Sequence, residues 1–138
     1  MKSIVWFRRD LRILDNSALY HAAEDSSGGV VGLYVITPKQ WAEHNDAACK
    51  VRFWLKNLEL LSQELAELNI PLRIEVSTGF EESTDVIMSF AAKQKVSAMY
   101  VNREYEFNEL KRDKIVEARC AKAQIKFNAY HDLSLIHI

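Results

Sequence analysis

The side chains that could do chemistry occur in three short segments, residues 8–12, 37–45 and 102–109. The last two segments offer His44 and Asn108 as hydrogen-bonding groups and Glu109 as a carboxylate. They also hold three flat side chains, Trp41, Tyr105 and Phe107. A carboxylate can accept two parallel hydrogen bonds from an amino group and an adjacent ring N–H, as in a pterin. This set of residues therefore suits a flat heterocycle that carries adjacent N–H donors.

Each of these residues also has a purely structural interpretation, which the residues alone leave open. Asn108 suits a helix N-cap, and Glu109 in the first helical turn would be stabilised by the helix dipole. His44 fits a surface histidine, and Trp41 and Tyr105 fit packing residues. In the first segment, Arg8 and Asp10 fit a solvated ion pair that orders the turn after a strand.

The motifs of several common chemistries do not occur in this sequence. No Gly-x-Gly-x-x-Gly follows the first strand and no P-loop lysine motif is present, so the usual modes of dinucleotide or triphosphate binding are not expected. The four histidines do not cluster with cysteines or carboxylates at the spacing of metal ligands. No Gly-x-Ser-x-Gly nucleophile motif occurs. The sequence therefore predicts no self-contained catalytic group.

Five apolar runs and four periodic segments must position the candidate residues. They predict strands over residues 4–7, 30–36, 72–76, 96–101 and 125–130, and helices over about residues 17–23, 47–68, 82–95 and 108–122. Strands that alternate with helices indicate a parallel sheet covered on both faces. The predicted fold class is α/β, a doubly wound, Rossmann-like sheet of five parallel strands in the order 3-2-1-4-5. That order brings the three segments to one edge, where such sheets bind ligands.

The longest helix and the third strand carry further patterns. Residues 72–76 alternate between apolar and charged, which indicates a strand with one less covered face, as at a sheet edge. Asn69 and Pro71 are expected to end the helix before it. Apolar residues at steps of three and four predict one buried face on that helix: Val51, Trp54, Leu55, Leu58, Leu61, Leu65 and Leu68.

Composition restricts the class of protein. A chain of 138 residues with 49% hydrophobic and 27% charged residues fits one globular domain. The formal net charge of −1 argues against this chain being the main nucleic-acid-binding surface, because contacts to phosphates need positive charge. Two distant cysteines, Cys49 and Cys120, and no signal peptide favour a cytoplasmic protein. No apolar run is long enough to span a membrane.

The start of the chain resembles the DNA photolyase/cryptochrome family. The resemblance lies in residues 5–12, Val-Trp-Phe-Arg-Arg-Asp-Leu-Arg, and in residues 15–19, Asp-Asn-Ser-Ala-Leu. Residues 38–45 and 105–109 are similar to two segments of folate-type photolyases, whose antenna is methenyltetrahydrofolate. The resemblance implies that His44 packs against this antenna and that Asn108 and Glu109 hydrogen-bond it.

The resemblance covers residues 3–132 and implies a function for them. Residues 1–132 would be the amino-terminal antenna domain of a light-driven deoxyribodipyrimidine photolyase, which repairs pyrimidine dimers in DNA. FAD and the site for damaged DNA would belong to a carboxyl-terminal helical domain beyond residue 138, so this piece alone would not be catalytic. A cytoplasmic monomer is expected.

Alternatives remain for the function and for the last six residues. A cryptochrome-like blue-light photoreceptor has a similar amino-terminal domain, and a stand-alone nucleotide-binding module could share the sheet topology. The lack of a glycine-rich phosphate loop counts against the module. Residues 133–138, Leu-Ser-Leu-Ile-His-Ile, fit a translated adapter sequence that is not native to the protein, or a short natural tail.

Overall fold

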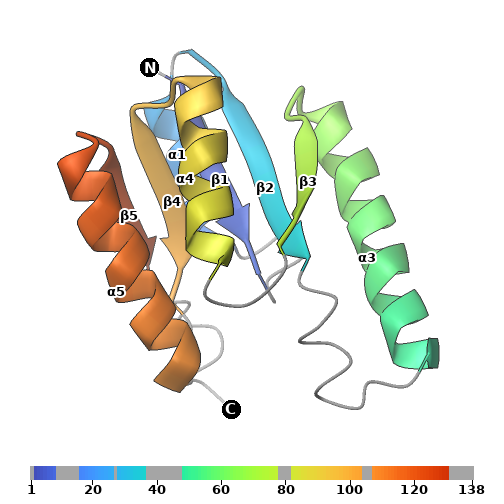
Figure 1. Ribbon diagram of the computed structural model, residues 1–138. Helices are drawn as coiled ribbons and strands as arrows, with labels where there is room; N and C mark the ends of the chain where they lie inside the picture. Colours follow the sequence, from blue (N-terminus) through green and yellow to red (C-terminus); the bar gives the residue numbers. More distant parts are fainter. Residues whose placement is uncertain are drawn as a thin grey trace.

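Five parallel strands form one sheet in the order β3-β2-β1-β4-β5 (Figure 1). The computed structural model describes residues 2–8, 16–26, 28–36, 48–77, 82–103 and 107–130. The strands are β1 (Ser3–Phe7), β2 (Val30–Ile36), β3 (Leu72–Val76), β4 (Ala98–Asn102) and β5 (Lys126–Tyr130). The predicted fold class and strand order are confirmed.

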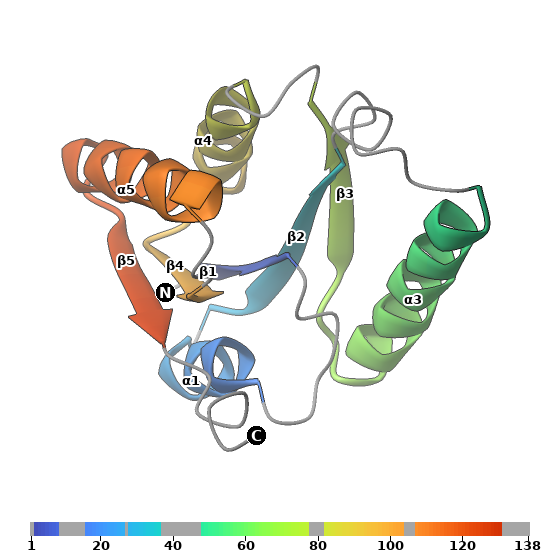
Figure 2. The same cartoon turned by 90° about the horizontal axis from the view of Figure 1, so that it is seen from below.

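Among the described residues, four helices cover the two faces of the sheet. They are α1 (Ser17–Asp25), α3 (Ala48–Glu67), α4 (Ser83–Gln94) and α5 (Phe107–Lys122). In Figure 2, α4 and α5 lie on one face and α1 and α3 on the other. Most element bounds differ from the predicted ones by one or two residues, which is the usual uncertainty at element ends. No helix among the described residues is long and apolar enough to cross a membrane.

The central strand β1 contributes side chains to both hydrophobic cores, and all five of its residues are buried. Because successive strand residues point to opposite faces, Ile4 and Trp6 pack with α4 and α5, whereas Val5 and Phe7 pack with α1 and α3. Cys120 on α5 is a buried free thiol, and burial raises its pKa to about 11. It therefore packs as a small apolar residue.

The edge position of β3 follows from the strand order and agrees with its alternating sequence. Ile74 and Val76 are exposed although they lie on the apolar face of the alternation, so the expectation that the charged face is the less covered one was wrong. The neighbouring strand approaches closely at Gly32, where a Cβ atom would lie 3.1 Å from side-chain atoms of both Leu72 and Phe7. A larger residue at this point would therefore require these side chains to shift by a few tenths of an ångström.

The predicted buried face of α3 is only partly confirmed. Leu58, Leu61 and Leu65 are buried, but Leu55 and Leu68 are exposed. Leu55 belongs to the amino-terminal half of α3, which diverges from β3 (Figure 1), and Leu68 follows the last residue of the helix. The side chains of Val51 and Trp54 lie outside the described part of the structure. The helix ends as predicted, with Asn69 at a φ of 61°.

Two adjacent leucines on α3 test this packing. Leu61 is 1% exposed and Leu60 is 46% exposed. We expect Leu61→Ala to lower the free energy of unfolding by about 2–5 kcal/mol, because it leaves a cavity. The matched control Leu60→Ala should change it by less than about 0.5 kcal/mol. Urea denaturation followed by circular dichroism measures both, and equal losses would contradict the packing described here.

Helix α1 is held to the sheet by aromatic and polar contacts. The ring of His21 stacks on Tyr130 with centroids 4.4 Å apart. The hydroxyl of Tyr100 donates a hydrogen bond of 3.1 Å to the Asp25 carboxylate. Burial raises the pKa of Tyr100 to about 12, and the hydrogen bond to Asp25 acts in the same direction.

The raised pKa of Tyr100 predicts a loss of stability at alkaline pH. In the unfolded chain a tyrosine ionises near pH ~10, so above that pH the unfolded state releases a proton that the folded state keeps. At pH 7, Tyr100→Phe should cost about 1 kcal/mol through the lost hydrogen bond. We expect this difference from wild type to shrink as the pH rises from about 10 towards 12.

Urea denaturation at several pH values measures the difference between the two proteins. The exposed Tyr20→Phe variant is the control for loss of a surface hydroxyl at pH 7. A difference between wild type and Tyr100→Phe that stays constant up to pH about 12 would contradict the assignment.

Candidate functional site

The carboxyl ends of β2, β1 and β4 lie side by side at one edge of the sheet. β1 pairs in parallel with β2 on one side and with β4 on the other. From β1 the chain first adds β2 and β3 on one side of the sheet and then β4 and β5 on the other. The switch point, where doubly wound folds bind ligands, therefore lies between β1 and β4. Figure 2 looks onto this edge, from which the chain leaves towards segments 9–15, 37–47 and 104–106.

The predicted binding residues fall in two different situations. His44 lies outside the described residues, as do Trp41 and Tyr105. Asn108 and Glu109 lie in the first turn of α5 at the carboxyl edge. Because α5 begins at Phe107, Asn108 is inside the helix, and its prediction as the N-cap was wrong. Whether His44 approaches the other two residues stays a prediction.

The described part of α5 packs on the sheet directly after its first turn. Asp113, Val116 and Cys120 are buried, and their spacing of three and four residues follows the helical repeat. Position 109 lies about one turn before Asp113, and position 108 lies about one turn before Arg112. The first turn of α5 therefore leads directly into the part of the helix that packs on the sheet.

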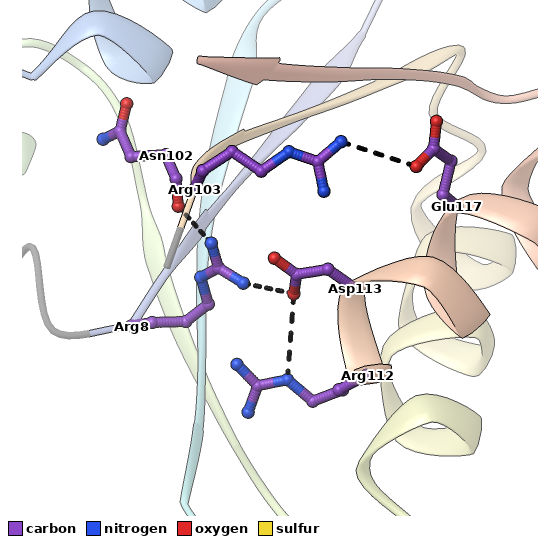
Figure 3. A network of polar contacts seen from close by, with 6 residues as sticks. All are labelled: Arg8, Asn102, Arg103, Arg112, Asp113 and Glu117. Atoms are coloured by element: carbon purple, nitrogen blue, oxygen red, sulfur yellow. Dashed lines mark hydrogen bonds and ion pairs between the residues drawn. The ribbon is translucent and has the colours of Figure 1, made fainter. Parts of the chain in front are cut away.

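Arg8, directly after β1, forms a buried ion pair across the fold. Its Nη1 donates to Asp113 Oδ1 at 2.5 Å, and its Nη2 donates to the backbone carbonyl of Asn102 at the end of β4 (Figure 3). Arg8 is 6% exposed and Asp113 is fully buried. The interpretation of Arg8 as a solvated charge was therefore wrong, and Asp10 lies outside the described residues.

A second arginine, Arg112 on α5, lies beside the ion pair of Arg8 and Asp113. The guanidinium carbons of Arg8 and Arg112 each lie 4.8 Å from a ring centroid of Trp6, a cation–π distance. Arg112 Nε lies 4.0 Å from Asp113 Oδ1. Burial raises the pKa of Asp113, and the positive charges of Arg8 and Arg112 oppose that rise. Among the described residues, Asp113 Oδ2 has no hydrogen-bond partner.

Sequence reasoning missed Asp113 and Arg112, although one signal was present. Asp113 is a charged residue at helical spacing from the apolar residues Val116 and Cys120, a pattern that indicates a buried partner of opposite charge. The identity of that partner was not readable, because Arg8 is 105 residues away.

Two asparagines tie the end of β4 to α1. Asn102 Nδ2 donates to Asn16 Oδ1 at 2.7 Å, and Asn102 Oδ1 accepts from the backbone N–H of Ala18 at 3.0 Å. Asn16 Oδ1 also accepts from the N–H of Leu19 at 3.1 Å, so Asn16 is the N-cap of α1. After β4, Arg103 pairs with Glu117 of α5 at 3.5 Å. These contacts place α1, β1, β4 and α5 in fixed relation at the edge.

The arrangement is suited to holding a ligand rather than to reacting with it. Its described polar groups are engaged mainly with one another, and they fix backbone segments that border the edge. Among the residues described, no group of three histidine, cysteine or carboxylate side chains could hold a metal ion.

Comparison with known proteins decides the family. The family model described as DNA photolyase matches residues 3–138. The chain belongs to the DNA photolyase family. The deoxyribodipyrimidine photo-lyase of Buchnera aphidicola (subsp. Baizongia pistaciae) is 40% identical over 134 residues, which cover 97% of this chain and 28% of that protein.

A cryptochrome and a solved photolyase structure are also similar to this chain. Cryptochrome-1 of Arabidopsis thaliana is 39% identical over 113 residues, which cover 80% of this chain and 16% of the relative. The archaeal photolyase from Sulfolobus tokodaii superposes with a TM-score of 0.77 at 30% identity, covering 95% of this chain and 29% of that structure. The chain thus spans less than a third of the length of each of these photolyase-family proteins.

The role of Asn102 in this photolyase-family domain can be tested by one substitution. Asn102→Ala removes the hydrogen bonds to Ala18 and Asn16, and we expect the free energy of unfolding to fall by about 1–3 kcal/mol because buried groups lose their partners. Asn128→Ala is the matched control, since its amide makes only long contacts of 3.4 and 3.5 Å. Thermal unfolding measures both variants, and an equal effect would contradict the role of Asn102.

Proposed function

We propose that residues 1–132 are the antenna-chromophore-binding domain of a light-driven deoxyribodipyrimidine photolyase, and that residues 133–138 lie outside this domain. The observation that carries the proposal is the first turn of α5 beside the switch point, in a chain of the DNA photolyase family. The Buchnera relative, named for this lyase activity, is 40% identical almost throughout the chain and supports it.

The pigment proposed for this domain is methenyltetrahydrofolate, bound by Asn108 and Glu109 and packed against His44. The fit rests on the chemistry of the donor set. The amino end of α5 carries a partial positive charge that favours the ionised form of a carboxylate in its first turn. An ionised Glu109 accepts hydrogen bonds from the amino group and ring N–H of a pterin.

FAD is the rival pigment for the same edge of the sheet. The S. tokodaii photolyase holds two FAD molecules, with a novel light-harvesting cofactor implied. In this chain no glycine-rich phosphate motif follows β1, which disfavours a dinucleotide in the usual Rossmann mode. The folate is therefore the better match.

The proposal also assigns separate roles to this domain and to the rest of the whole protein. A bound antenna absorbs near-ultraviolet or blue light and passes the excitation through space to a reduced flavin. The residues of this chain then need only bind the pigment, fix its orientation and shield it from water. FAD and damaged DNA are assigned to a carboxyl-terminal helical domain, which is also the proposed partner of this edge. We place the protein in the cytoplasm, as a monomer that does not engage membranes.

A cryptochrome-like photoreceptor is the second candidate, favoured by the 39% identity to Arabidopsis Cryptochrome-1. The two functions differ in what the complete protein does to DNA. Light-dependent repair of a thymine dimer in an oligonucleotide by the complete product of the gene supports the photolyase. Flavin photoreduction without repair supports the photoreceptor.

Pigment binding tests the assignment of Glu109. We expect methenyltetrahydrofolate to bind with a red-shifted absorption band, and Glu109→Gln to weaken binding by about tenfold or more, because a hydrogen bond to a charged group is lost. Glu64→Gln, on the exposed side of α3, is the matched control and should bind as wild type does. Absorption titrations with the folate and with FAD measure the affinities.

Three results would contradict this assignment. Full binding by Glu109→Gln would remove Glu109 from the site. Tighter binding of FAD than of the folate would replace the pigment. Absence of folate binding both in this chain and in the complete product of the gene would remove the folate altogether.

A further inference from the structure

We propose that Arg8 and Asp113 are positioning residues of the pigment site, which set where the first turn of α5 stands over the edge of the sheet. The inference rests on the proposed function for the ligand but on separate observations for the positioning. Neither residue needs to touch the pigment. They act through the backbone that carries positions 108 and 109.

The two candidate ligand positions are each one helical turn away from an anchored residue. Position 109 precedes Asp113 by four residues and position 108 precedes Arg112 by four, a rise of about 6 Å along the helix. Asp113 is held by Arg8 at 2.5 Å, and Arg112 lies over Trp6 at 4.8 Å. The orientation and height of the first turn of α5 are therefore determined by contacts made immediately behind it.

The anchor reaches both strands that border the switch point. Arg8 directly follows β1, and its Nη2 donates to the carbonyl of Asn102, the last residue of β4. One guanidinium thus joins the ends of two neighbouring strands to α5 (Figure 3). A displacement of α5 along or around its axis would have to break this buried pair.

Stability is a poor explanation for the buried pair. Removing two charges from water is costly, and apolar residues of similar volume are often as stabilising as a buried ion pair. Here Asp113 Oδ2 has no partner among the described residues, so the carboxylate is not even fully satisfied. Buried charge pairs can instead select one geometry among several packings, and the geometry selected here is that of the first turn of α5.

A pair of double variants separates positioning from stability. Arg8→Met/Asp113→Leu replaces the buried pair by apolar residues. Arg119→Met/Asp85→Leu is the matched control, because Arg119 Nη1 and Asp85 Oδ1 are also 2.5 Å apart and also fix α5, but in an exposed pair that links it to α4. Each variant is compared with wild type in thermal unfolding, in folate titration and in backbone residual dipolar couplings of residues 107–111.

We expect Arg8→Met/Asp113→Leu to unfold near the wild-type temperature, to bind the folate about tenfold more weakly, and to change the couplings of residues 107–111 more than those of β1 and β4. The control should keep the affinity and those couplings. Wild-type affinity and couplings in a folded Arg8→Met/Asp113→Leu variant would overturn the proposal, because a merely structural pair is fully replaced by apolar packing.

The test also covers a double variant that does not fold and a protein that binds no folate. If the double variant does not fold, Asp113→Asn takes its place: a shift in the couplings confined to residues 107–111 supports positioning, and a uniform change or none overturns it. If neither this chain nor the complete product of the gene binds folate, the proposed pigment fails, but the couplings still decide whether Arg8 and Asp113 position the first turn of α5.

Discussion

The arrangement of elements at the carboxyl edge of the sheet depends on one buried charge pair, Arg8 with Asp113, at the point where β1 ends. A guanidinium that lies inside the protein must find acceptors there, because water does not reach it. Arg8 finds them in the Asp113 carboxylate of α5 and in the backbone carbonyl of Asn102 at the end of β4. The requirement to satisfy a single cation therefore brings two strand ends and a helix into one arrangement.

The remaining contacts at this edge extend the same arrangement towards α1. Asn102 joins β4 to Asn16 and to the first turn of α1, so the central strands are tied to helices on both faces of the sheet. The result is a connected set of contacts that joins two helices and two central strands at the carboxyl edge of the sheet. The pigment that we propose needs a fixed distance and orientation, and such contacts serve that need without acid, base or nucleophile.

Much of the fold was readable because its signals are local. Apolar runs and helical periodicity depend on residues close in sequence, and the strand order follows from the limited ways in which β-α units connect. The edge position of β3 was readable for the same reason, but its alternation did not show that Ile74 and Val76 are exposed. The burial of Leu55 and Leu68 was predicted wrongly, because periodicity shows which side of a helix is apolar but not how far the sheet extends beneath it.

The sequence by itself determined the family, the doubly wound sheet and the edge at which its three candidate segments meet. Only the tertiary structure decided that Arg8 is buried, that its partner is Asp113 and that Asn108 lies inside α5 rather than at its cap. The physical reason is distance along the chain. Arg8 and Asp113 meet only after β1 and α5 have packed across Trp6, and no local pattern specifies that contact between residues 105 positions apart.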